Sequence, residues 1–288
     1  MKKFFFYIIV IVCCCSFVCS KPDRDAKVLN QPQQVGVFPE LGVKLGSDTT
    51  VREILVNSDI PPDLQRILKA YPDYIDSVDY NTIYWKDGTT MIYDDGIKDK
   101  TFEEKLDNPD IEDMMSIEYI KGDNYPNPPP ANYDPGRIRY EPFFEKIYGE
   151  NETEVRSFLV KVRWMPATVN KSILITSANG VNRQLQAVSD ELDRLSSELK
   201  KYVNNPAGTF VYRVIAGTNR KSTHSYGIAI DINTEYSDYW RWDKTIEYKN
   251  KIPLEIVKVF EKYGFIWGGK WYHYDTMHFE YRPELLIE

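Results

Sequence analysis

The chain has 288 residues, 42% hydrophobic and 27% charged, with 43 acidic side chains against 36 basic ones. Its length suits one large domain, or a small domain beside a larger one. The acidic balance argues against nucleic acid as a partner, because phosphates need a basic surface.

The first twenty residues have the pattern of an export signal. Lys2 and Lys3 precede an apolar and cysteine run from Phe4 to Val18, interrupted only by Ser16, which is short for a membrane span. We therefore expect residues 1–20 to be a signal peptide. The protein would be exported, and would be periplasmic, secreted or held at the cell envelope.

All four cysteines lie inside this segment, at positions 13, 14, 15 and 19. The mature chain would then contain neither a disulfide framework nor a thiolate metal site. Acylation of Cys19 would give a lipid anchor instead, although the preceding Ser-Phe-Val is a poor signal for it. Any membrane association is therefore expected only through the signal peptide or such an anchor.

Residues 21–50 are polar and are expected to form a linker. Residues 51–130 are expected to form an N-terminal region of unknown role, which could tether the protein to the wall or to a partner. Within it, the apolar spacing near Pro61 predicts a helix, and Asp87-Gly88 predicts a hairpin. The proline-rich stretch 124–130 is the expected boundary, and residues 131–288 the expected catalytic domain.

The second part of the chain mixes helical and strand patterns without regular alternation. Strands are predicted at 158–164, 173–176, 209–216, 227–234 and 276–281, and helices at 141–149, 181–199 and 253–263. This order predicts an α+β fold with a small, mainly antiparallel sheet and flanking helices.

Histidine is scarce, with three residues in the whole chain. The expected strand 227–234 directs its three isoleucines toward a core and Asp231 to the opposite face. A carboxylate in that apolar setting needs a cation, either an arginine or a metal such as Zn²⁺. His224 lies in the preceding loop, where Gly227 would let the chain turn the imidazole back toward Asp231.

The last predicted strand supplies a matching set. His278 and Glu280 share one face, and Asp275 lies at the turn into the strand. Asp275 would lie next to the same metal ion without coordinating it, and would accept a proton from the water that attacks the substrate. Glu280 is expected to hold a ligand imidazole in the correct tautomer. His273 is expected to be exposed or to lie behind the ligands.

An anionic transition state also needs a positive partner. Arg213 is favoured for the substrate carbonyl or carboxylate, because a strand would fix its position. Arg220, in the loop that follows, is the alternative candidate for this role.

Taken alone, two histidines in separate strands more often have a structural role than a catalytic one.

Read together, the motifs Ser222-x-His224-x-x-Gly-x-Ala-x-Asp231 and Asp275-x-x-His278-Phe-Glu280 resemble the signature of the M15 metallopeptidases, enzymes of bacterial cell-wall metabolism. The stretch that ends at Trp271 resembles the tryptophan-glycine segment of that family. The resemblance covers roughly residues 155–288.

This resemblance implies Zn²⁺ held by His224, Asp231 and His278, with Asp275 as catalytic base and an arginine near the substrate, as Arg213 is placed. It also implies a fold like that of hedgehog domains and DD-peptidases. Four further residues are expected to support the ligands or to bind substrate, namely Ser222, Glu280, Trp271 and Arg220.

We therefore expect a zinc-dependent peptidase that hydrolyses peptidoglycan stem peptides. Aspartate at position 275 resembles the carboxypeptidase and endopeptidase branches, and a D-alanyl-D-alanine carboxypeptidase is the favoured activity. The alternatives are an L-alanyl-D-glutamate endopeptidase and a non-catalytic, zinc-stabilised domain that binds the cell wall.

Overall fold

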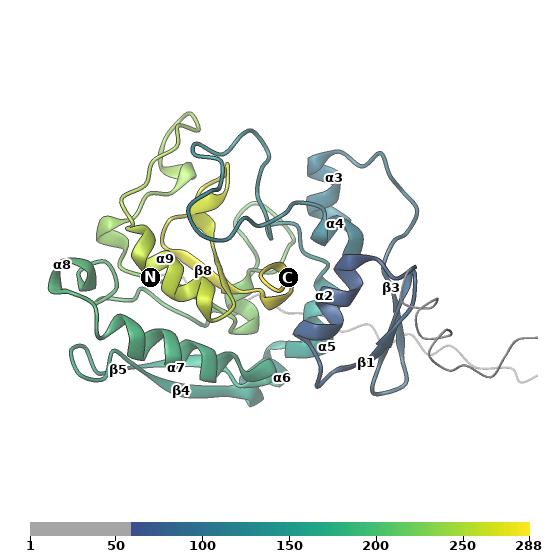
Figure 1. The fold of residues 1–288 in the computed structure, drawn as a ribbon, viewed down its shortest axis with the longest axis horizontal. Helices are drawn as coiled ribbons and strands as arrows, with labels where there is room; N and C mark the ends of the chain where they lie inside the picture. Colours follow the sequence, from purple (N-terminus) through teal and green to yellow (C-terminus); the bar gives the residue numbers. More distant parts are fainter. Residues whose placement is uncertain (1–58) are drawn as a thin grey trace, which may run out of the picture. The chain divides into compact units, whose positions relative to one another are not determined.

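The computed structural model describes residues 59–288. Helices pack around three small antiparallel sheets (Figure 1), which confirms the predicted α+β class. The expected signal peptide, the linker and the first residues of the N-terminal region lie outside the described residues. Within the described part of the chain, no helix is long and apolar enough to cross a membrane.

The N-terminal region contains a three-stranded sheet flanked by short helices. The predicted helix near Pro61 and the hairpin at Asp87-Gly88 are both present, and a further strand, β1, precedes the hairpin. The elements are α2 (Pro62–Ala70), β1 (Ile75–Val78), β2 (Thr82–Trp85), β3 (Thr90–Ile92), α3 (Phe102–Asp107) and α4 (Ile111–Met115).

A second sheet is the hairpin β4–β5, on which α7 packs (Figure 1). The elements here are α5 (Glu141–Tyr148), α6 (Glu152–Phe158), β4 (Leu159–Trp164), β5 (Lys171–Thr176), α7 (Val181–Leu192) and α8 (Ser197–Lys200). The helix predicted over 181–199 is thus broken after Leu192. At the break, the Asp193 carboxylate accepts a hydrogen bond from the Ala167 amide at 2.6 Å, a tertiary contact that apolar spacing does not record.

The third sheet has the order β6-β8-β7 and carries the candidate site. It consists of β6 (Ala229–Asp231), β7 (Phe265–Trp267) and β8 (His278–Tyr281), with α9 (Leu254–Lys262) preceding β7. The described residues also contain a 3₁₀ turn at Thr223–Tyr226, which carries His224. Five further 3₁₀ turns are Ala178–Gly180, Thr234–Tyr236, Trp240–Trp242, Gly268–Lys270 and Pro283–Leu285. Asp231 pairs with His278 across β6 and β8, so both side chains share one face of the sheet.

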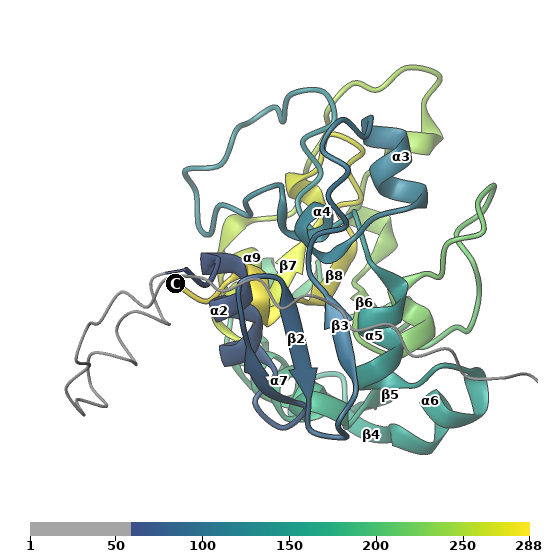
Figure 2. The same cartoon turned by 90° about the vertical axis from the view of Figure 1, so that its right-hand side faces the viewer.

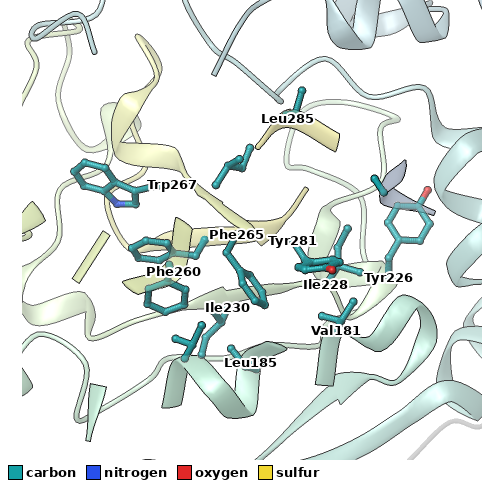
Figure 3. Close-up of a cluster of buried hydrophobic side chains, with 14 of the residues drawn as sticks. Val181, Leu185, Tyr226, Ile228, Ile230, Phe260, Phe265, Trp267, Tyr281 and Leu285 are labelled. Carbon is teal, nitrogen blue, oxygen red and sulfur yellow. The ribbon is translucent and has the colours of Figure 1, made fainter. Parts of the chain in front are cut away.

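The other face of this sheet is buried. Figure 3 shows Val181 and Leu185 of α7 next to Ile228 and Ile230, and all four side chains are fully buried. Phe260 of α9 stacks on Phe279 of β8 with the ring centroids 3.8 Å apart. This apolar layer fixes the sheet whose opposite face holds the histidines.

The prediction of a strand over residues 209–216 is wrong. This segment is a loop whose one β-bridge joins Val214 to Lys221, and the neighbouring Gly208 forms another with Asp231. Val211 and Val214 are each 50% exposed. Val211 and Val214 therefore have no apolar surface to cover them, as a strand in a packed sheet would provide.

The two predicted regions, 51–130 and 131–288, share one hydrophobic core. The Phe143 ring lies 5.1 Å from that of Tyr71 and 5.7 Å from that of Trp85, and the turned view in Figure 2 shows β2 and β3 beside α5. The Tyr71 hydroxyl donates to Glu284 at 2.6 Å. The separate role predicted for the N-terminal region stays a prediction.

Candidate metal centre

Three side chains bring one ligand atom each to a single point. His224 lies in a 3₁₀ turn, Thr223–Tyr226, which Gly227 ends at φ 65°. His224 Nε2 is 3.2 Å from Asp231 Oδ1 and 3.2 Å from His278 Nδ1. His278 Nδ1 is 3.1 Å from the same Asp231 oxygen. The sequence-predicted ligands are therefore brought together in a nearly equilateral triangle.

The outer nitrogens of both imidazoles already have partners. His224 Nδ1 lies 2.6 Å from the Thr209 carbonyl, which can only accept, so this nitrogen carries the proton. His278 Nε2 lies 3.0 Å from Glu280 Oε2 and has the same role. When both rings are neutral, Nε2 of His224 and Nδ1 of His278 each carry a lone pair, and both lone pairs face the Asp231 carboxylate oxygen.

Three acceptors facing one another repel unless a cation lies between them. Zn²⁺ with bonds of about 2.0–2.1 Å in tetrahedral geometry separates its ligand atoms by about 3.3 Å, close to the separations found here. The described residues thus fit a divalent cation such as zinc. Without one, burial lowers the pKa of His278, but hydrogen bonds with Asp231 and Glu280 outweigh burial and raise it to about 10.

Glu280 is completely buried behind His278. It pairs with Arg139 at 2.5 Å and with Arg282 at 3.2 Å, and it accepts a hydrogen bond from the Thr223 hydroxyl at 3.0 Å. Burial alone would raise the pKa of Glu280, but Arg139 and His278 hold it far below its usual value. The ionised carboxylate can therefore keep the His278 ring in the tautomer and orientation that a metal requires.

The three predicted ligands line a pocket with a volume of about 130 Å³, and Asp275 lines it too. Burial raises the pKa of its carboxyl to about 6. Its Oδ1 is buried and has no hydrogen-bond partner within residues 59–288. A buried, unpaired carboxylate oxygen beside the ligand triangle is suited to accept a proton from a molecule that enters the pocket.

Gly268 supports the position of Asp275. The Asp275 amide donates to the Gly268 carbonyl at 3.0 Å, and a Cβ on Gly268 would lie 2.7 Å from the Asp275 carbonyl oxygen and 3.0 Å from the Trp271 ring.

We expect Gly268→Ala to displace both Asp275 and Trp271. The kcat of the expected peptide hydrolysis should fall at least 10-fold, since a shift of about 1 Å can lower a rate about 100-fold. Steady-state kinetics would test this, with Gly208→Ala as control because no atom lies within 4 Å of its added Cβ. Unchanged kcat in Gly268→Ala would show that the close approach is not needed.

Four arginines line the pocket, namely Arg137, Arg139, Arg213 and Arg241. The side chains of Arg137 and Arg139 are only 15% and 11% exposed. Arg213, predicted to lie on a strand, is instead an exposed loop residue at the rim. Arg220 lies outside this pocket, in an adjoining cavity, with Asp107 3.6 Å away.

Arg137, Arg139 and Arg241 are site residues that the motifs did not reveal. Arg137 and Arg139 follow the proline-rich stretch, far from both motifs in sequence. Two arginines at alternate positions in an acidic chain are a weak signal for an anion site. Only the folded structure brings them beside the histidines.

The remaining predicted residues occupy different positions. Ser222 is buried in the pocket lining. The Trp271 ring lies 5.7 Å from that of His278, and its Nε1 donates to the Pro135 carbonyl at 2.7 Å. His273 lies outside the ligand triangle and pairs with Asp134 at 2.5 Å.

The converging ligand atoms and the buried carboxylate define a candidate hydrolytic metal centre. Residues 216–281 match the family model described as D-alanyl-D-alanine carboxypeptidase. This match supports the M15 family peptidase that the motifs predicted. The match includes His224, Asp231, Asp275 and His278 but not Arg213. No curated protein matches the chain.

Proposed function

We propose that this protein is a zinc-dependent peptidase that hydrolyses peptidoglycan stem peptides, acting as a D-alanyl-D-alanine carboxypeptidase. The observation that carries the proposal is the triangle of His224, Asp231 and His278, in which two lone pairs and a carboxylate converge with separations of 3.1–3.2 Å. The M15 family match supports action on cell-wall peptides.

His224, Asp231 and His278 would hold the zinc ion. Zinc would supply Lewis acidity there, which would lower the pKa of the attacking water and polarise the carbonyl group of the substrate. Asp275 accepts the proton of the attacking water at its unpaired Oδ1 and then gives that proton to the leaving amine. The Glu280 carboxylate keeps the His278 ring in place while charge develops.

Arg137 and Arg139, the two nearly buried arginines of the pocket, give the substrate its positive partner. Arg137 lies 5.9 Å from the centroids of both the Trp240 and the Trp271 rings, which hold the guanidinium at the pocket wall. Its Nε is 3.7 Å from Asp134, so other N–H groups remain for a substrate carboxylate. We therefore propose that Arg137, and not Arg213 at the exposed rim, binds the C-terminal carboxylate.

The second candidate function is an L-alanyl-D-glutamate endopeptidase. A cavity of about 970 Å³ adjoins the pocket and shares Arg139 with it. Residues 106–109 of the N-terminal region form part of its wall. An endopeptidase must accommodate chain on both sides of the scissile bond, and this cavity offers the additional room.

Mass spectrometry of digested peptidoglycan would separate these functions. A carboxypeptidase removes one terminal D-Ala from each pentapeptide, whereas an endopeptidase releases peptides that begin with D-Glu. Chelation should abolish cleavage and added Zn²⁺ should restore it. Cleavage that persists after complete removal of the metal would overturn zinc dependence, and the absence of any cleavage by zinc-loaded protein would overturn the peptidase proposal.

The proposed substrate lies outside the cytoplasmic membrane. We accordingly propose that the protein is exported through the signal predicted at residues 1–20, with acylation of Cys19 as the alternative way to reach the envelope. Mass determination of the N-terminus of the mature protein distinguishes cleavage before Lys21 from a lipid-modified Cys19.

A further inference from the structure

The pocket contains more guanidinium groups than one C-terminal carboxylate requires. We propose that Arg213 and Arg241 form a second anion subsite at its rim, which selects acidic peptides that carry a second free carboxylate in addition to the C-terminal one. This inference rests on the proposed peptidase function and concerns its substrate class.

The four arginines fall into an inner and an outer pair. Each inner arginine has a carboxylate partner: Arg137 lies 3.7 Å from Asp134, and Arg139 lies 2.5 Å from Glu280. Neither Arg213 nor Arg241 forms an ion pair within the described part of the chain. Their positive charges are therefore not neutralised by the protein.

Both outer arginines are held to the same loop by backbone carbonyl groups. Arg241 Nη1 donates to the Ala216 carbonyl at 2.9 Å, and Arg213 Nη1 contacts the Val214 carbonyl at 3.5 Å. The Arg241 guanidinium also lies 5.0 Å from the centroid of the Trp240 ring. These contacts use few of the five N–H donors on each side chain, so most donors stay available at the rim.

This concentration of positive charge is unusual in a chain whose formal net charge is −7. The two outer guanidinium groups, which have no carboxylate partner, lie at the rim of a pocket of about 130 Å³ and repel one another, and a bound divalent cation would add to that repulsion. The two carboxylates in the lining, Asp231 and Asp275, are engaged by the ligand triangle and by proton transfer. An anionic ligand relieves the repulsion, and the field attracts such ligands to the pocket.

The chemistry of stem peptides offers a second anion of this kind. A glutamate linked through its γ-carboxyl group leaves the α-carboxyl free, and that group is either a carboxylate or an amide. A carboxylate accepts charge-assisted, bidentate hydrogen bonds from arginine, whereas an amide has no net charge. The rim is therefore expected to distinguish the acid from the amide.

The test uses two synthetic pentapeptides that end in D-Ala-D-Ala and differ only at this α-carboxyl group, free in one and amidated in the other. With zinc-loaded protein, kcat/KM should be about 10-fold or more higher for the free acid, as expected when charge-assisted hydrogen bonds are lost. Calorimetry with metal-free protein should show the same preference in Kd. Raising the salt concentration should reduce the preference.

Arg241→Gln should bring the acid-to-amide ratio close to 1, with zinc content unchanged, and Arg213→Gln should act in the same direction. Lys244→Gln is the matched control, because Lys244 is exposed three positions from Arg241 and does not line the pocket; its ratio should equal that of the wild type. Equal kcat/KM and equal Kd for the two peptides in the wild type would overturn the second subsite alone. Failure to bind or cleave either peptide would overturn the peptidase function and the subsite together.

Discussion

Replacement of Asp275 by asparagine is expected to lower kcat/KM by about 10²–10⁴-fold, the range for loss of a general base. The amide keeps the shape of the carboxyl group but cannot accept the proton at Oδ1. The three ligand side chains are untouched, so zinc should still bind with a stoichiometry of one. Kinetics on a defined pentapeptide, together with elemental analysis for zinc, measures both quantities.

The pH profile gives an independent readout of the same residue. Burial raises the pKa of Asp275 to about 6, and a cation at the ligand triangle would lower it from there. Because a base must be ionised to act, turnover should decline as the pH falls through a pKa at or below about 6. Asp275→Asn should lose this acid limb.

Asp243→Asn provides the control for this substitution. Asp243 is partly exposed and pairs with Lys249 at 2.6 Å, outside the pocket lining, so its replacement should leave kcat/KM within about 2-fold, as surface substitutions usually do. Full activity in Asp275→Asn would remove Asp275 as the base and would leave the metal site unaffected.

His278→Ala is expected to abolish the stabilisation that zinc gives the protein. A ligand that binds only the folded state raises its free energy of unfolding, by about 2.7 kcal/mol at a concentration 100 times the dissociation constant. Loss of one of three protein ligands should weaken zinc binding so strongly that added zinc no longer shifts Tm. The quantity compared is the zinc-dependent change in Tm of each variant, so that a lower starting Tm does not disturb the result.

The third histidine supplies the control. His273 pairs with Asp134 at 2.5 Å and contributes no atom to the ligand triangle. Its replacement by alanine can lower Tm but should leave the zinc-dependent change intact. An equal zinc response in His278→Ala and in the wild type would contradict the proposed metal centre.

The ligand face of the third sheet could be predicted because strand alternation is a local property. In β6 and β8, alternate residues point to opposite faces, so Asp231 was separated from its neighbouring isoleucines, and His278 was grouped with Glu280, from sequence alone. The register that sets Asp231 opposite His278 joins segments far apart in the chain. The family resemblance implied that Asp231 and His278 bind one ion and so lie close together, whereas the alternation of residues along each strand carries no information about which strands pair.

Other parts of the site depend on contacts that have no local pattern. The segment 209–216 has β-branched residues, yet Val211 and Val214 remain exposed, so propensity gave the wrong element and the wrong setting for Arg213. Arg139 reaches the site only because Glu280 lies 2.5 Å from it in the fold. No sequence spacing reports which carboxylate a distant arginine will pair with.

The hydrogen bond between Tyr71 and Glu284 joins residues that are 213 positions apart. His278 and Glu280 also belong to the final strand. The candidate metal centre therefore cannot be complete until synthesis has passed His278. A chain still too short to include His278 would lack one of the three proposed ligand side chains, and we expect it to be inactive.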